Sequence, residues 1–188
     1  MPHFMNTYKK NKNSGFTLLE VMVVTGIISV IIGIAVPNVI AWLPKYRLKS
    51  AARDIISFMQ EVKLEAIKTN TTLEIIFDNS GTPGYYYLDL NKDGNHDPGE
   101  QRVNLSGYLS GVSFGSGSAT NNWETPPNPI TSSVTFNVNK LRFSARGMSN
   151  TPGTVFINNK NNDICYAVTV LTTGSINIRK WTGTAWTN

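Results

Sequence analysis

The chain has 188 residues, a formal net charge of +5 and a charged fraction of only 15%. Three lysines and no acidic residue lie within residues 1 to 15, so the rest of the chain carries a net charge of +2 (five minus three). So small a charge argues against a general nucleic-acid-binding protein. The abundance of Asn, Thr, Ser and Gly is more typical of an extracytoplasmic, β-rich domain than of a cytosolic enzyme.

The first predicted element is an apolar helix over residues 16 to 43. Between Phe16 and Pro44 the only ionisable side chain is Glu20, and the run is long enough to cross a bilayer as a helix. A short basic segment with Lys9, Lys10 and Lys12 precedes it and ends at Gly15. In an ordinary secretory signal the small residue of the cleavage site follows the apolar segment, whereas here Gly15 precedes it. A carboxylate in such a helix is costly and indicates a partner or a function.

The motif Gly15-Phe16-Thr17-Leu18-Leu19-Glu20, followed by an apolar helix, resembles the class III leader of type IV prepilins and of the related pseudopilins of type II secretion. The resemblance implies that a membrane-embedded prepilin peptidase cuts after Gly15 and that Phe16 is then N-methylated. It also implies that Glu20 helps to pack one subunit against the next and that Pro37 kinks the helix. The alternative is a simple membrane anchor with a tolerated glutamate.

The segment 44 to 70 is predicted to continue the helix as an amphipathic rod that ends near Thr69. Its apolar residues recur at spacings of three and four, which places them on one helical face. These residues are Leu48, Ala52, Ile55, Met59, Val62 and Ala66. We expect this face to pack on the domain that follows.

Residues 71 to 188 are predicted to form one globular β-domain, which gives a pilin-like α+β fold in which the long helix packs on an antiparallel sheet or sandwich. The expected strands are 72–77, 85–90, 101–105, 112–114, 134–138, 141–144, 154–157, 164–171 and 175–180. Among Tyr85, Tyr86 and Tyr87, only the first and third can share a face, because strand side chains alternate.

Residues 89 to 100 match the calcium-loop pattern D-x-[DN]-x-[DN]-G-x5-E. Oxygen ligands at loop positions one, three and five can wrap an ion, glycine at six makes the turn, and glutamate at twelve can bind bidentately. The predicted ligands of Ca²⁺ are Asp89, Asn91, Asp93, the carbonyl of Asn95, Asp97 and Glu100. The flanks read as strands, so this would be a calcium loop between two strands. Two simple polar turns are the alternative.

Residues 106 to 133 are rich in Gly, Ser, Asn and Pro and are expected to form a long, flexible, exposed loop. Trp123 within it is either incidental or an exposed anchor for a partner. Farther on, Phe143-Ser144-Ala145-Arg146-Gly147 and Thr173-Gly174-Ser175-Ile176 resemble the closing β-region of the H-type pseudopilins, the GspH/FimT group. That resemblance implies a minor subunit rather than a major pilin.

Catalysis is not expected. Cys165 is the only cysteine, and its strand-like surroundings predict a small buried apolar side chain. A catalytic thiol needs a base and an orienting group, but His3 lies in the leader and His96 has no motif that links it to Cys165. No triad, phosphate-binding loop or paired-carboxylate motif supports a membrane-anchored enzyme, so we expect no enzyme and no required cofactor.

The favoured function is therefore that of a minor pseudopilin or minor pilin, a structural subunit of a type II secretion pseudopilus or a type IV pilus. The resemblance implies a single-pass inner-membrane protein with a periplasmic domain. Its implied partners are other pilin or pseudopilin subunits, the prepilin peptidase and the inner-membrane assembly platform. The alternative is a minor pilin that binds DNA during uptake, through basic residues such as Arg179 and Lys180 interleaved with aromatic side chains.

Overall fold

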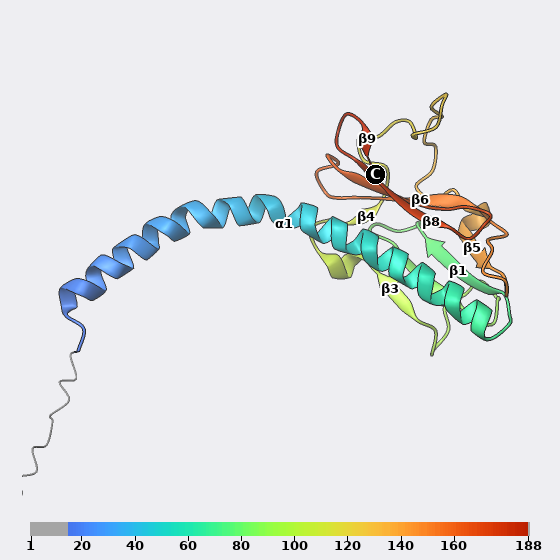
Figure 1. Cartoon of the computed structure of the whole chain (residues 1–188), viewed down its shortest axis with the longest axis horizontal. Helices are drawn as coiled ribbons and strands as arrows, with labels where there is room; N and C mark the ends of the chain where they lie inside the picture. The colour runs from blue at the N-terminus through green and yellow to red at the C-terminus, as the bar shows by residue number, and fades with distance from the viewer. Residues whose placement is uncertain (1–14, 188) are drawn as a thin grey trace, which may run out of the picture. The chain divides into compact units, whose positions relative to one another are not determined.

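The computed structural model describes residues 15–187, so the predicted leader lysines Lys9, Lys10 and Lys12 lie outside the described residues. One long helix, α1 (Leu18–Lys68), is followed by short strands (Figure 1). The strands are β1 (Leu73–Asp78), β2 (Tyr85–Asp89), β3 (Arg102–Asn104), β4 (Ser113–Phe114), β5 (Lys140–Phe143), β6 (Gly153–Asn158), β7 (Cys165–Val170), β8 (Ile176–Trp181) and β9 (Trp186–Thr187). Two 3₁₀ helices, η1 (Leu105–Tyr108) and η2 (Asn137–Asn139), complete the described elements. The chain divides into two units, with the boundary between Ala41 and Trp42.

The first unit contains the apolar part of α1. Its polar side chains bind the helix itself: the hydroxyl of Thr17 accepts the N–H of Glu20 (3.2 Å), as an N-cap residue does, and Ser29 donates to the carbonyl of Thr25 (2.7 Å). Its large apolar side chains are exposed. By length and composition α1 contains one segment that could cross a membrane, and the helix runs through Pro37 and Pro44 without interruption.

The second unit begins with the amphipathic part of α1. All six residues that the spacing places on the buried face are buried, together with Ala51 and Phe58. The prediction for this face is therefore confirmed.

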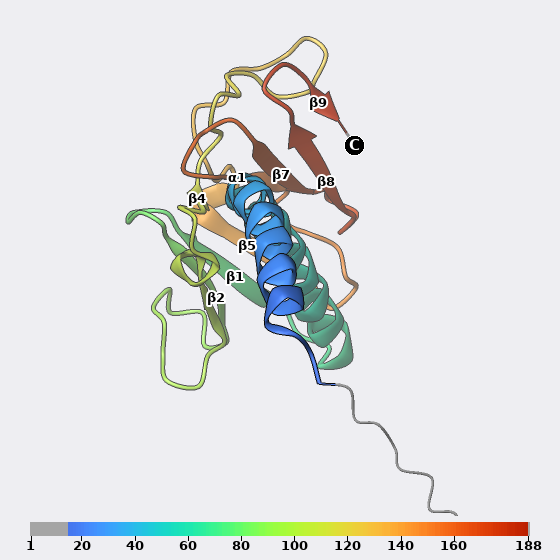
Figure 2. The same ribbon diagram turned by 90° about the vertical axis from the view of Figure 1, so that its left-hand side faces the viewer.

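Two antiparallel sheets form the rest of the second unit. The first sheet has the strand order β3-β2-β1-β5, and the second sheet has the order β4-β6-β7-β8-β9. Every pairing between strands is antiparallel. Figures 1 and 2 show both sheets beside the cyan-to-green part of α1. The predicted pilin-like arrangement, a long helix packed on an antiparallel β-domain, is confirmed.

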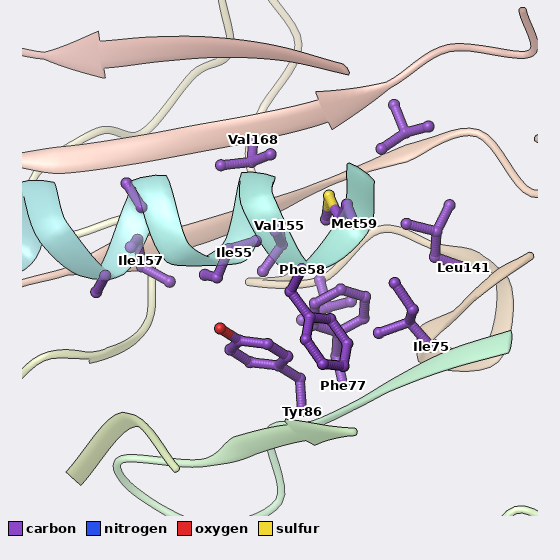
Figure 3. Packing of buried hydrophobic residues seen from close by; sticks show 14 of the residues in the cluster. Ile55, Phe58, Met59, Ile75, Phe77, Tyr86, Leu141, Val155, Ile157 and Val168 are labelled. Carbon is purple, nitrogen blue, oxygen red and sulfur yellow. The ribbon is translucent and has the colours of Figure 1, made fainter. Parts of the chain in front are cut away.

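One hydrophobic core joins the helix to both sheets. Ile55, Phe58 and Met59 of α1 point between Phe77 and Tyr86 of the first sheet and the valines of the second sheet (Figure 3). Burying each large apolar side chain is worth about 1.5 to 3 kcal/mol. The amphipathic half of α1 is thus a structural part of the domain.

The sequence-based strands differ from the structure at two places. Residues 134–138 form no strand: Val134 makes a single bridge to Val155, and the chain then turns at Val138 and Asn139 with positive φ angles of 53° and 55°. An extended strand cannot continue through left-handed backbone. The short strand β9 was not expected from the sequence, because it has only two residues. It pairs with β8 after the turn formed by residues 182–185.

The long segment 106–133 covers part of the second sheet. Trp123 packs against Phe156 and Trp186, with ring centroids 6.4 and 5.2 Å apart, over the face opposite the main core. Trp123 is half-buried against this small second cluster and does not stand free in solvent, and its role as an anchor for a partner stays a prediction.

Candidate functional site

The predicted cleavage site lies just before α1. Gly15, Phe16 and Thr17 adopt no regular structure, the helix begins at Leu18, and the Phe16 side chain is 83% exposed. A peptide bond outside a helix can enter a peptidase without unwinding of backbone hydrogen bonds. The geometry at this bond is therefore compatible with the predicted cut, which stays a prediction.

Glu20 lies in the first turn of α1, three residues after Thr17. Its side chain is exposed, and within the described part of the chain it takes part in no salt bridge. The N-terminal end of a helix favours a negative charge. In an apolar surrounding, however, a carboxylate still needs a cation.

The predicted calcium loop joins β2 to β3. Asp89 is fully buried, and its carboxylate accepts the N–H groups of Lys92 (2.6 Å) and Gly94 (2.9 Å). Gly94 has a φ of +84°, a conformation that glycine adopts without steric cost. Glu100 closes the loop by accepting the N–H groups of Leu90 (2.7 Å) and Asp97 (3.0 Å).

The other predicted ligands are also held by the loop. The side chain of Asn91 donates to Asp97 (2.7 Å), and Asp93 accepts the N–H of Asn95 (2.7 Å), which lowers the pKa of the Asp93 carboxyl. Within residues 15–187 no three His, Cys, Asp or Glu side chains gather closely enough to hold a metal ion. The carboxylates thus bind backbone amides in this conformation, and calcium binding stays a prediction.

The basic side chains on which the DNA-binding alternative depends do not lie together on one surface. Arg179 lies over the ring of Trp123 (5.4 Å), on the outer face of β8, whereas Lys180 faces α1. Arg142 and Lys140 approach the buried carboxylate of Glu74, at 2.8 and 3.9 Å. The β-domain cations therefore form no single row.

Cys165 is buried in β7, and burial raises the pKa of its thiol to about 12. The ring of His96 lies against Tyr87 (5.4 Å between centroids), in the loop after β2. A buried neutral thiol without an adjacent base is not a nucleophile. The structural interpretation of Cys165 is confirmed.

A basic groove in the second unit was not predicted from the sequence. Lys45, Lys49 and Arg53 of α1 line a pocket of about 370 Å³ together with Tyr166 of β7 and Lys180 of β8. The three cations of α1 are spaced four residues apart, and this spacing could have predicted that they share one helical face. No local sequence pattern could assign Lys180 to the same groove, because it lies more than a hundred residues away in the chain.

Comparisons with known proteins agree with the N-terminal motif and with the β-domain. Residues 10–36 match the prokaryotic N-terminal methylation motif, and residues 51–174 match the family described as type II transport protein GspH. The pilin-like protein PilA1 of Thermus thermophilus is 34% identical over 88 residues, which cover 46% of this chain and 55% of that protein. The chain therefore spans about half the length of this relative.

Among solved structures, the type IV minor pilin FimU of Pseudomonas aeruginosa is similar, with a TM-score of 0.48 and 16% identity. The similarity covers 71% of this chain and 89% of that one. The GspH match extends over most of the chain and describes structural subunits, which confirms the prediction that the protein is not an enzyme. The chain belongs to the GspH family, and it is a minor pilin or pseudopilin of the type II secretion and type IV pilus class that carries a prepilin-type processing motif.

Proposed function

We propose that this protein is a structural subunit of a type II secretion pseudopilus or a type IV pilus, and that it acts in protein secretion or pilus assembly. The observation that carries the proposal is the order of parts in one chain: a methylation motif at residues 10–36 and then a GspH domain at residues 51–174. The motif supports anchoring in the inner membrane before assembly. The β-domain would then lie in the periplasm, beside the assembly platform.

In this proposal the prepilin peptidase cuts between Gly15 and Phe16, and the new amino group of Phe16 is methylated. Glu20 then supplies a carboxylate for that amino group in a neighbouring pilin or pseudopilin subunit. Both charges would otherwise be unpaired in an apolar surrounding, so the pair favours one register between helices. Pro37 would adjust the helix within the filament.

The test is the Glu20→Ala variant of the full chain, produced in its own host and crosslinked before purification from membranes. We expect the peptidase to cut the variant normally. The amount of co-purified pilin-like subunits should fall on the order of tenfold, because a buried ion pair that loses one partner costs several kcal/mol. Mass spectrometry of the crosslinked products measures this loss.

Ser29→Ala is the matched control. It removes one polar group from the same apolar helix, but the Ser29 hydroxyl binds only a carbonyl of its own helix. Assembly should therefore be unchanged. Equal recovery of subunits with Glu20→Ala and with the unaltered chain would contradict the role of Glu20, and absence of pilin-like partners from the unaltered chain would contradict the proposed function.

A minor pilin that binds DNA during uptake is the second candidate function. Its support is the cation content of the C-terminal half, above all Arg179 and Lys180, but these two side chains lie on opposite faces of β8. We further propose Ca²⁺ as an ion held by Asp89, Asn91, Asp93, Asn95, Asp97 and Glu100, on the strength of the sequence pattern.

A further inference from the structure

The basic groove brings four cations together from two distant parts of the chain. Lys45, Lys49 and Arg53 follow one another along α1, and Lys180 approaches from β8. Tyr166 of β7 and Ile164, which directly precedes that strand, also line the groove. A groove with cations on both walls can hold an anion by more than one contact.

Most of this positive charge is not neutralised within the protein. Lys45 approaches Asp163 at 3.8 Å, a partly exposed pair. In the described part of the chain, Lys49, Arg53 and Lys180 take part in no salt bridge. Three cations in one groove therefore lack a counter-charge and favour an anionic ligand.

The groove begins where the apolar run ends. Trp42 and Tyr46 also line it, with tilted rings whose centroids are 4.9 Å apart, and Trp and Tyr side chains are typical of a membrane–water interface. At a rise of about 1.5 Å per residue, Lys45 to Arg53 cover only about 12 Å of helix. Helical side chains also lean toward the N-terminus, here toward the apolar segment, and long cationic side chains can extend farther in that direction.

We propose that the groove binds the phosphate groups of anionic phospholipids at the surface of the membrane that the apolar helix crosses. This inference rests on the proposed membrane anchoring. A bilayer surface presents phosphates at high local concentration beside residues 42–46, whereas a nucleic acid would have to approach the same anionic surface against like-charge repulsion. The contacts would hold the β-domain against the membrane until the subunit enters a filament.

The test is lysine footprinting of the full chain in lipid nanodiscs. One set contains only phosphatidylcholine, and the other also contains phosphatidylglycerol. An amine-reactive reagent labels exposed lysines, and mass spectrometry gives the labelling rate at each position. We expect Lys49 and Lys180 to react about fivefold more slowly with phosphatidylglycerol present, while the exposed Lys92 and Lys160 react equally in both sets.

Arg53→Gln and Arg146→Gln form a matched pair of variants. Both remove one exposed arginine, but only Arg53 lines the groove, and both reporter lysines stay in place. Arg53→Gln should remove most of the protection of Lys49 and Lys180, and Arg146→Gln should leave it intact. High salt should weaken the protection in the unaltered chain, because it screens the exposed charges.

Equal labelling of Lys49 and Lys180 in the two nanodisc sets would overturn the proposal. So would equal protection in phosphatidylcholine discs by inorganic phosphate, which would show that no lipid is needed. Protection in those discs by DNA alone would instead support the nucleic-acid alternative. A chain that is processed and assembles but shows no protection would refute the lipid site alone and leave the proposed filament function standing.

Discussion

Cys165 shows at the residue scale how burial decides chemistry. Its thiol lies in β7 beside Gly115 and donates weakly to that carbonyl at 3.6 Å. Removal from water penalises the thiolate, so the pKa rises from 9.0 to about 12. The thiol is therefore inert at neutral pH and serves as a packing residue.

The raised pKa of Cys165 predicts a loss of stability at high pH. The unfolded chain releases the thiol proton near pH 9, whereas the native chain holds it until about 12. In this window the free energy of unfolding should fall by up to about 1.4 kcal/mol per pH unit from this one proton. Denaturant unfolding of the unaltered chain and of Cys165→Ala at several pH values measures the difference, because other titrating groups contribute to both.

The slope should be shallower for Cys165→Ala above pH 9 and equal to that of the unaltered chain at neutral pH. Parallel slopes throughout would show that the thiol ionises alike in both states. That result would contradict the inert role assigned to Cys165.

At the element scale, the loop from β2 to β3 can be tested for calcium through Asp93, an exposed carboxylate at the fifth loop position. If Ca²⁺ binds there, Asp93→Ala should lower the melting temperature in calcium much more than in chelator. Saturating calcium at about a hundred times the Kd adds about 2.7 kcal/mol. Thermal unfolding in both buffers measures the difference.

Lys92→Ala is the control within the same loop, because position four supplies no side-chain oxygen ligand. Its backbone N–H still binds Asp89. We expect it to keep the calcium-dependent shift. An equal loss for Asp93→Ala in calcium and in chelator would mean that Asp93 only accepts the N–H of Asn95 and shapes a turn.

Elements with a regular spacing of apolar residues could be predicted from the sequence. Elements whose conformation depends on tertiary contacts could not. The buried face of α1 follows from spacing alone, and Ile55 and Met59 lie where the pattern places them. Val134 to Val138 has the composition of a strand, yet positive φ angles interrupt it. Trp123 lies in a polar loop, but its side chain is half-buried because it packs against Phe156 and Trp186 of strands that follow later in the chain.

Across the whole molecule, the N-terminal processing site could be predicted from the sequence, whereas the basic groove could not. The N-terminal motif is local and complete, so Gly15, Phe16 and Glu20 could be assigned candidate roles without a structure. The basic groove needs Arg53 and Lys180 in one place, and only the packing of β8 on α1 provides that. Contacts between residues that are far apart in the chain cannot be predicted from a local sequence pattern.

A prepilin-type subunit is cut by the prepilin peptidase, so processing of this chain tests whether it is one. The measurement is the intact mass and N-terminal sequence of the full chain from membranes, with and without a co-expressed prepilin peptidase. A Gly15→Leu variant is the control, because a Cβ atom added at Gly15 meets no described atom within 4 Å.

We predict a chain that begins at methylated Phe16 only when the peptidase is present, and an uncut Gly15→Leu variant. A chain that keeps Met1 beside an active peptidase would contradict the assignment of a prepilin-type leader. The apolar helix would then be a simple anchor, and Glu20 would have no amino group of Phe16 to pair with.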